Sequence, residues 1–122
     1  MFTGHWINDQ GSVMELHQDG TTITGVYVTR IGSDKVVEQR HTLVGQATGA
    51  LIGFVVAWPA SGSLTSWAGR MVTGPDGAQA IHSVWHLARA RRSPTRRSAL
   101  GNLPYLHQQF PAQAIVHWTR YD

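Results

Sequence analysis

The chain has 122 residues, of which 42% are hydrophobic and 14% are charged, and it contains no cysteine. This length and composition are typical of one globular domain, and they exclude an intrinsically disordered chain, disulfide cross-links and thiolate chemistry. The formal net charge is +3, but half of the ten Lys and Arg residues lie within 89–97, so the rest of the chain is mildly acidic.

Short β-branched and aromatic runs, separated by turn signals, predict eight antiparallel strands. The expected strands cover residues 5–8, 12–18, 22–29, 37–47, 51–58, 64–73, 78–88 and 114–121. Asp19-Gly20 and Gly74-Pro-Asp-Gly77 are the clearest turns between them, and no stretch has the 3.6-residue periodicity of a useful helix. The sequence therefore predicts a single all-β domain over 1–122, with a long basic loop at 89–111.

Eight strands of this length can close into an up-and-down β-barrel whose interior holds one small ligand. Closure also removes the exposed edges that an open sheet of short strands would present. We therefore expect an eight-stranded antiparallel barrel.

The stretch 54–67 contains the pattern that most clearly indicates a ligand. Side chains alternate between the two faces of a strand, and the Pro and Ser-Gly within 59–62 interrupt the strand. One face carries Phe54, Val56 and Trp58 before the turn, and Ser63, Thr65 and Trp67 after it. Two indoles and two hydroxyls directed into one space suit a small polar ligand held between aromatic walls.

The same alternation places polar side chains near one end of several strands. These side chains are Asn8, Ser12, Tyr27, Thr29, Ser63 and Thr65. If those strand ends meet, the pocket has a polar floor, with Trp58, Trp67 and Trp85 around it. The alternative is a plain barrel core in which the hydroxyls bond to nearby backbone groups, and composition leaves both interpretations open.

Several short motifs resemble those of the avidin and streptavidin family in order and in spacing. They are Trp6-Ile-Asn-Asp-Gln-Gly-Ser12, Thr24-Gly-Val-Tyr27, Phe54-Val-Val-Ala-Trp58, Ser63-Leu-Thr-Ser-Trp67, Ser83-Val-Trp85-His-Leu87 and Trp118-Thr-Arg120. Each motif is weak alone, but together they cover most of residues 3–88. The resemblance implies an avidin-like barrel that binds biotin without catalysis, closest in its loop features to the dimeric avidins.

The resemblance also implies a role for each matching position. Asn8, Ser12 and Tyr27 would donate hydrogen bonds to the ureido oxygen, and Thr29 would accept one from a ureido N–H. Thr65 would face the sulfur atom, inside a cage of Trp58, Trp67, Trp85 and Leu87. The valeryl chain and carboxylate would meet Ile31, Gly32, Ser33 and Ser63. Trp6 would pack the closed end of the barrel, with Arg120 stacked on it.

Two positions depart from the family pattern. Val116 stands where the family has an acidic or amide residue facing a ureido N–H, and a buried N–H without a partner costs roughly 1–3 kcal/mol. Asn102 takes that role only if the alignment shifts. The residues 89–113 contain no tryptophan to cover a neighbouring pocket, and Phe110 or Leu100 is a candidate substitute.

Other activities are less well supported by the sequence. The acidic residues are dispersed and no nucleophile–base pair is apparent, so we expect no enzyme activity and no cofactor besides the ligand biotin. His82 and His86 lack a third ligand nearby, so no metal site is expected. No aromatic residue is interleaved in the arginine cluster, which argues against nucleic-acid binding.

Location and assembly are expectations from the resemblance, which favours a secreted or periplasmic homodimer or larger oligomer. No signal peptide is recognisable in this chain, and no apolar run approaches the roughly 20 residues of a membrane-spanning helix. Two competing hypotheses are a lipocalin-like carrier of another small ligand and an avidin-like assembly module with weakened biotin binding.

Overall fold

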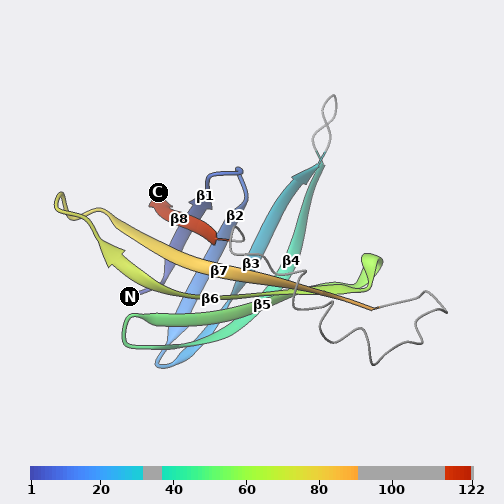
Figure 1. Cartoon of the computed structure of the whole chain (residues 1–122), viewed down its shortest axis with the longest axis horizontal. Helices are drawn as coiled ribbons and strands as arrows, with labels where there is room; N and C mark the ends of the chain where they lie inside the picture. Colours follow the sequence, from blue (N-terminus) through green and yellow to red (C-terminus); the bar gives the residue numbers. More distant parts are fainter. Residues whose placement is uncertain (32–36, 91–114, 122) are drawn as a thin grey trace.

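The computed structural model describes residues 1–31, 37–90 and 115–121 as a closed antiparallel β-barrel (Figure 1). Its eight strands are β1 Gly4–Asn8, β2 Val13–Asp19, β3 Thr22–Ile31, β4 Val37–Thr48, β5 Leu51–Trp58, β6 Ser63–Thr73, β7 Gln79–Arg89 and β8 Ile115–Tyr121. Neighbours in sequence pair with one another, and β8 pairs with β1 to close the circle. The predicted fold class is therefore confirmed.

The predicted strand boundaries lie within one residue of the observed ones at most ends. β3 continues two residues farther than expected, to Ile31. The turn signals act as their chemistry suggests, since Gly20 and Gly77 have φ angles of 62° and 86°, a backbone region that glycine enters without a Cβ clash.

The break after β5 is a short 3-10 turn, Pro59–Ser61, and not an irregular loop. Pro59 occupies the first turn, where its missing N–H is not needed. The Gly62 amide donates to the Pro59 carbonyl at 3.1 Å, and Gly62 adopts a left-handed conformation with φ 63°. The turn thereby returns the chain so that Ser63 pairs with Trp58.

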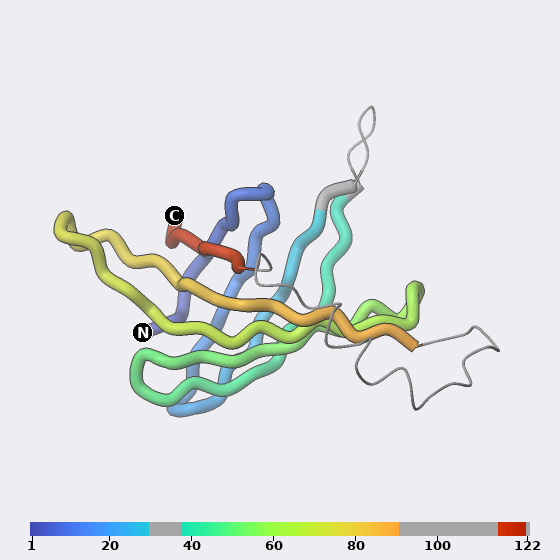
Figure 2. Tube along the Cα trace, in the orientation of Figure 1, coloured from blue at the N-terminus to red at the C-terminus, as the bar shows by residue number. Residues whose placement is uncertain are grey.

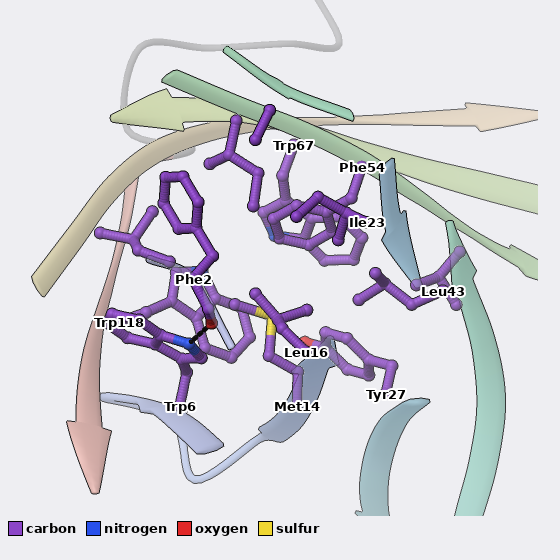
Figure 3. Packing of buried hydrophobic residues seen from close by; sticks show 14 of the residues in the cluster. Phe2, Trp6, Met14, Leu16, Ile23, Tyr27, Leu43, Phe54, Trp67 and Trp118 are labelled. Carbon is purple, nitrogen blue, oxygen red and sulfur yellow. Dashed lines mark hydrogen bonds between the residues drawn. The ribbon is translucent and has the colours of Figure 1, made fainter. Parts of the chain in front are cut away.

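Inward-facing side chains of all eight strands form one core, and the largest ones fill one end of the barrel (Figure 3). Trp6 and Trp118 are fully buried there together with Phe2. The Trp6 indole N–H donates to the Phe2 carbonyl at 2.9 Å. The Arg120 guanidinium lies 4.3 Å from the Trp6 ring centroid, as the resemblance implied, and this stacking helps to close the end.

Within the described ranges, no helix is long and apolar enough to cross a membrane.

Candidate functional site

A cavity of about 190 Å³ lies inside the barrel, where polar and aromatic side chains from six strands and one turn meet. Its wall consists of Asn8, Gln10, Tyr27, Thr29, Trp58, Thr65, Trp67, Trp85 and Val116. All of these except Gln10 are site residues named from the sequence. The structure thus places eight of the predicted side chains around one space.

Asn8 organises the polar floor of this cavity. Its carboxamide oxygen accepts hydrogen bonds from the backbone N–H groups of Gln10, at 3.0 Å, and Ser12, at 2.9 Å. These bonds hold the turn between β1 and β2, in which the Gly11 amide also donates to the Asn8 carbonyl at 3.1 Å. Because the oxygen is engaged, the two N–H bonds of the Asn8 NH₂ group are its donors toward Tyr27 and toward a ligand.

The Tyr27 hydroxyl completes a cluster of three side chains on β1, the following turn and β3. It forms hydrogen bonds with the side chains of Ser12 and Asn8. Burial raises the pKa of the Tyr27 phenol above its ordinary value of 10.0, while the two hydrogen bonds act in the opposite direction. The phenol is therefore neutral at physiological pH and can donate its proton to an acceptor.

Thr29 contributes a polar atom that has no partner among the described residues. Its hydroxyl oxygen is buried without a hydrogen bond, although Thr29 lies in the cavity wall. A buried hydroxyl without a partner costs roughly 1–3 kcal/mol. A ligand group that bonds to this hydroxyl would recover that cost.

Aromatic rings form the opposite wall. The Tyr27 ring stacks on Trp67 at a centroid distance of 5.2 Å, and Trp67 stacks on Phe54 at 4.9 Å (Figure 3). Trp58 meets the Tyr27 ring edge-on at 5.6 Å, and its indole N–H donates to the Thr65 hydroxyl at 2.8 Å. The bond fixes the Trp58 ring and leaves the Thr65 proton free to donate elsewhere.

Some predicted site residues are not part of this cavity wall. Ser12 is half-buried beside Tyr27, and Leu87 is half-buried on β7 opposite Thr65. The Ser63 hydroxyl is 2.8 Å from the Ser61 hydroxyl at the exposed turn. The described residues do not include Gly32, Ser33 and Phe110, the alternatives Leu100 and Asn102, or the side chain of Ile31.

Sequence reasoning missed two residues near the site. Gln10 lines the cavity from the turn, and its place between Asn8 and Ser12 in the first motif was the available signal. His41 lies on β4 opposite Tyr27, with its ring 4.5 Å from that of Trp58 and its Nε2 buried without a partner in the described part of the chain. Strand alternation along β4 could have placed His41 inward.

From the sequence, His82 and His86 are expected on the outer face of the barrel. His82 and His86 are exposed on β7, and the His82 ring stacks on His117 of β8 at 4.1 Å. Among the residues that the structure describes, no group of three or more His, Cys, Asp or Glu side chains could hold a metal ion.

Comparisons with known proteins agree on one family. A sequence profile described as the Avidin family matches residues 1–100. Afifavidin from Afifella pfennigii is 36% identical in an alignment of 89 positions that covers 68% of this chain and 55% of that protein. The chain thus spans about half the length of this curated relative.

Solved structures show the same fold. Xenavidin has a TM-score of 0.72 at 21% identity, over 98% of this chain and 97% of that one. A rhizavidin–biotin complex has a TM-score of 0.68 at 23% identity, over 98% and 99% of the two chains. A shwanavidin–biotin complex has a TM-score of 0.66 at 20% identity, over 99% and 98%.

Proposed function

The chain belongs to the avidin family, and on this premise we propose that it binds biotin, without catalysis, in the cavity between Tyr27 and the tryptophans. The observation that carries the proposal is the convergence of three neutral donors. The side chains of Asn8, Ser12 and Tyr27 lie within hydrogen-bonding reach of one another at the floor, beneath an aromatic wall, and in a complex their protons would turn toward the ligand.

The donor cluster matches the oxygen of a cyclic urea. That oxygen carries partial negative charge, and several convergent donors in a partly dry site stabilise such an oxygen, as an oxyanion hole does. A typical hydrogen bond contributes about 0.5–1.5 kcal/mol net. The cluster therefore both orients the ureido ring and excludes ligands that lack an acceptor at this point.

The rest of the cavity suits the remainder of biotin. The Thr29 hydroxyl would accept a bond from one ureido N–H. Trp58, Trp67 and Trp85 would enclose the fused rings, and Thr65 would direct its free proton to the thioether sulfur. Leu87 would extend the cage.

The outer part of the site would receive the valeryl chain and its carboxylate. We assign this role to Ile31, Gly32, Ser33 and Ser63, of which Ser63 is at the turn after β5. Phe110 would act as a cover. Val116 lies in the cavity wall and offers no acceptor, so we expect weaker binding than an acidic residue there would allow.

We also propose that the protein self-associates through the outer face of β4–β7, where four strands run side by side (Figure 2). Val44 and Leu51 are 47% and 54% exposed there. Between the side chains of this face lies a hollow of about 960 Å³, bordered in part by Gly53 and Ala68. A concave apolar face of this kind suits a second copy of the chain in a homodimer or larger oligomer.

The family resemblance favours a secreted or periplasmic location.

Titration with biotin tests the proposed function. Trp58 and Trp85 are partly exposed around the cavity, whereas Trp6 and Trp118 are fully buried in the core. Biotin should therefore change the tryptophan fluorescence saturably, and calorimetry should give one site per chain with a dissociation constant of about 1 μM or lower.

A long-chain fatty acid is the matched control ligand because it lacks a urea group. Absence of any heat or fluorescence change at micromolar biotin would contradict the proposal. Tighter binding of the fatty acid would indicate an apolar carrier, and oligomers without biotin binding would indicate an assembly module.

A further inference from the structure

The cavity is asymmetric in its hydrogen-bonding groups. A cyclic urea presents one carbonyl oxygen flanked by two N–H groups on opposite sides. The floor cluster around Tyr27 serves the oxygen, and Thr29 on β3 lies on one flank with a hydroxyl that has no partner among the described residues. On the β8 side the wall is the apolar side chain of Val116, which is 7% exposed. Of the strand residues that line the cavity, Thr29 offers an acceptor on one flank and Val116 offers none on the other.

The turn after β1 supplies a polar side chain on this apolar side. Gln10 lies in the turn that directly follows β1, whose last residue, Asn8, pairs with Trp118 of β8. Gln10 and Val116 both line the same cavity. From this turn the Gln10 side chain can reach the flank beside Val116, where the second N–H group of a cyclic urea would point.

The backbone of Gln10 is held in a fixed relation to the floor. Its N–H donates to the Asn8 carboxamide oxygen at 3.0 Å, and that oxygen also receives the Ser12 N–H at 2.9 Å. No hydrogen bond within the described part of the chain engages the Gln10 side-chain amide. The side chain is exposed, so it can rotate to present its oxygen to a ligand without losing an existing partner.

We propose that the Gln10 carboxamide oxygen accepts the hydrogen bond of the second ureido N–H group, so that the β1–β2 turn, and not β8, completes recognition of biotin. This inference rests on the proposed function. The bond is neutral and partly exposed to water, so its contribution is modest compared with that of a buried carboxylate. Gln10 is then a specificity residue for ligands with two N–H groups.

Substitution at position 10 gives the first test. Gln10→Met keeps the length of the side chain and removes its acceptor, and it should weaken biotin binding about three- to tenfold. Gln10→Glu keeps an acceptor oxygen and should bind at least as tightly as the wild type. Asp9→Asn, an exposed neighbour in the same turn, is the matched control and should change nothing.

A double-mutant cycle separates this role from a general effect on the turn. Val116→Asp adds an acceptor on the same flank and should tighten binding. In the Val116→Asp background, Gln10→Met should weaken biotin binding less than about twofold, because the two acceptors serve the same N–H group.

The outcomes are distinct. A wild-type chain that does not bind biotin overturns both this inference and the proposed function. Tight wild-type binding that is unchanged in Gln10→Met overturns only this inference. The inference is also overturned if Gln10→Glu weakens biotin binding as much as Gln10→Met does. The same holds if Gln10→Met weakens binding equally in the wild type and in the Val116→Asp variant. Thermal melts of the ligand-free variants, expected to coincide, show that the turn is intact.

Discussion

At the scale of single residues, Tyr27 connects the polar floor of the cavity to its aromatic wall. Its ring stacks on Trp67, while its hydroxyl bonds with Ser12 and Asn8. One side chain thus provides both a donor and a packing surface. The two roles can be separated because Tyr27→Phe removes the hydroxyl and keeps the ring.

Tyr27 predicts how stability and binding depend on pH. Burial raises the pKa of the phenol above 10.0, so the fold favours the neutral form. Its contribution to stability is complete below pH 10.0 and is lost as the pH rises through the raised pKa. Biotin affinity should fall over the same alkaline range, since the phenolate cannot donate. Calorimetry and denaturant unfolding from about pH 7 to about pH 11 measure both.

Tyr27→Phe is the control for this dependence. At neutral pH it should weaken biotin binding by roughly 1–3 kcal/mol, about five- to 150-fold, and the affinity of this variant should not fall at alkaline pH. Tyr121→Phe, at an exposed site on β8, should match the wild type. An affinity of the wild type that stays constant or rises toward about pH 11 would contradict the donor role of Tyr27.

At the scale of strands, the close approach of β4 and β5 depends on a glycine. A Cβ atom on Gly45 would collide with the Gly53 carbonyl oxygen and lie 2.7 Å from the Phe54 Cα. Gly53 has no such constraint, because a Cβ atom there would have the Trp67 carbonyl oxygen, at 3.6 Å, as its nearest neighbour. The two positions belong to adjacent strands of one ladder, which makes them a matched pair.

Gly45→Ala should therefore lower the free energy of unfolding by about 1–3 kcal/mol, because the strands must separate to admit the methyl group. Gly53→Ala should lower it much less, because a Cβ atom there meets no atom of its own barrel closer than 3.6 Å. Denaturant unfolding at one protein concentration compares them. Equal effects of the two substitutions would show that the β4–β5 spacing is not limiting.

Strand periodicity explains how much could be predicted from the sequence. Alternation correctly placed Asn8, Thr65 and Trp67 on inward faces, since a strand with one buried face has a strict period of two. Gln10 lies in a turn, where no period applies. His41 does follow the strand period, but a single histidine on a strand does not by itself indicate a residue of a binding site.

Details of the hydrogen bonding could not be predicted in the same way. The engagement of the Asn8 oxygen by two backbone amides and the bond from Trp58 to Thr65 depend on three-dimensional positions. Sequence patterns specify which face a side chain occupies, but not which atom bonds to which.

At the scale of the whole molecule, the apolar outer face of β4–β7 predicts assembly. The wild-type chain should have at least twice its 13.4 kDa mass in light scattering. Leu51→Lys places a charge on that face and should shift the protein to the monomer mass, since burying an unpaired charge is costly. Thr24→Lys, on the exposed side of β3, is the control. A monomeric wild type, or a Leu51→Lys variant that still assembles, would contradict this interface.

The pairing of β1 with β8 has a consequence for how the protein folds. The Thr119 hydroxyl donates to the Ile7 carbonyl across 112 positions of sequence, so the ladder that closes the barrel joins its first and last strands. Such non-local contacts slow folding, typically to milliseconds or seconds, because the entropy of closing the chain is lost before the contacts form. The proposed biotin site draws on strands from both ends of the chain, and it is complete only when β1 and β8 are paired.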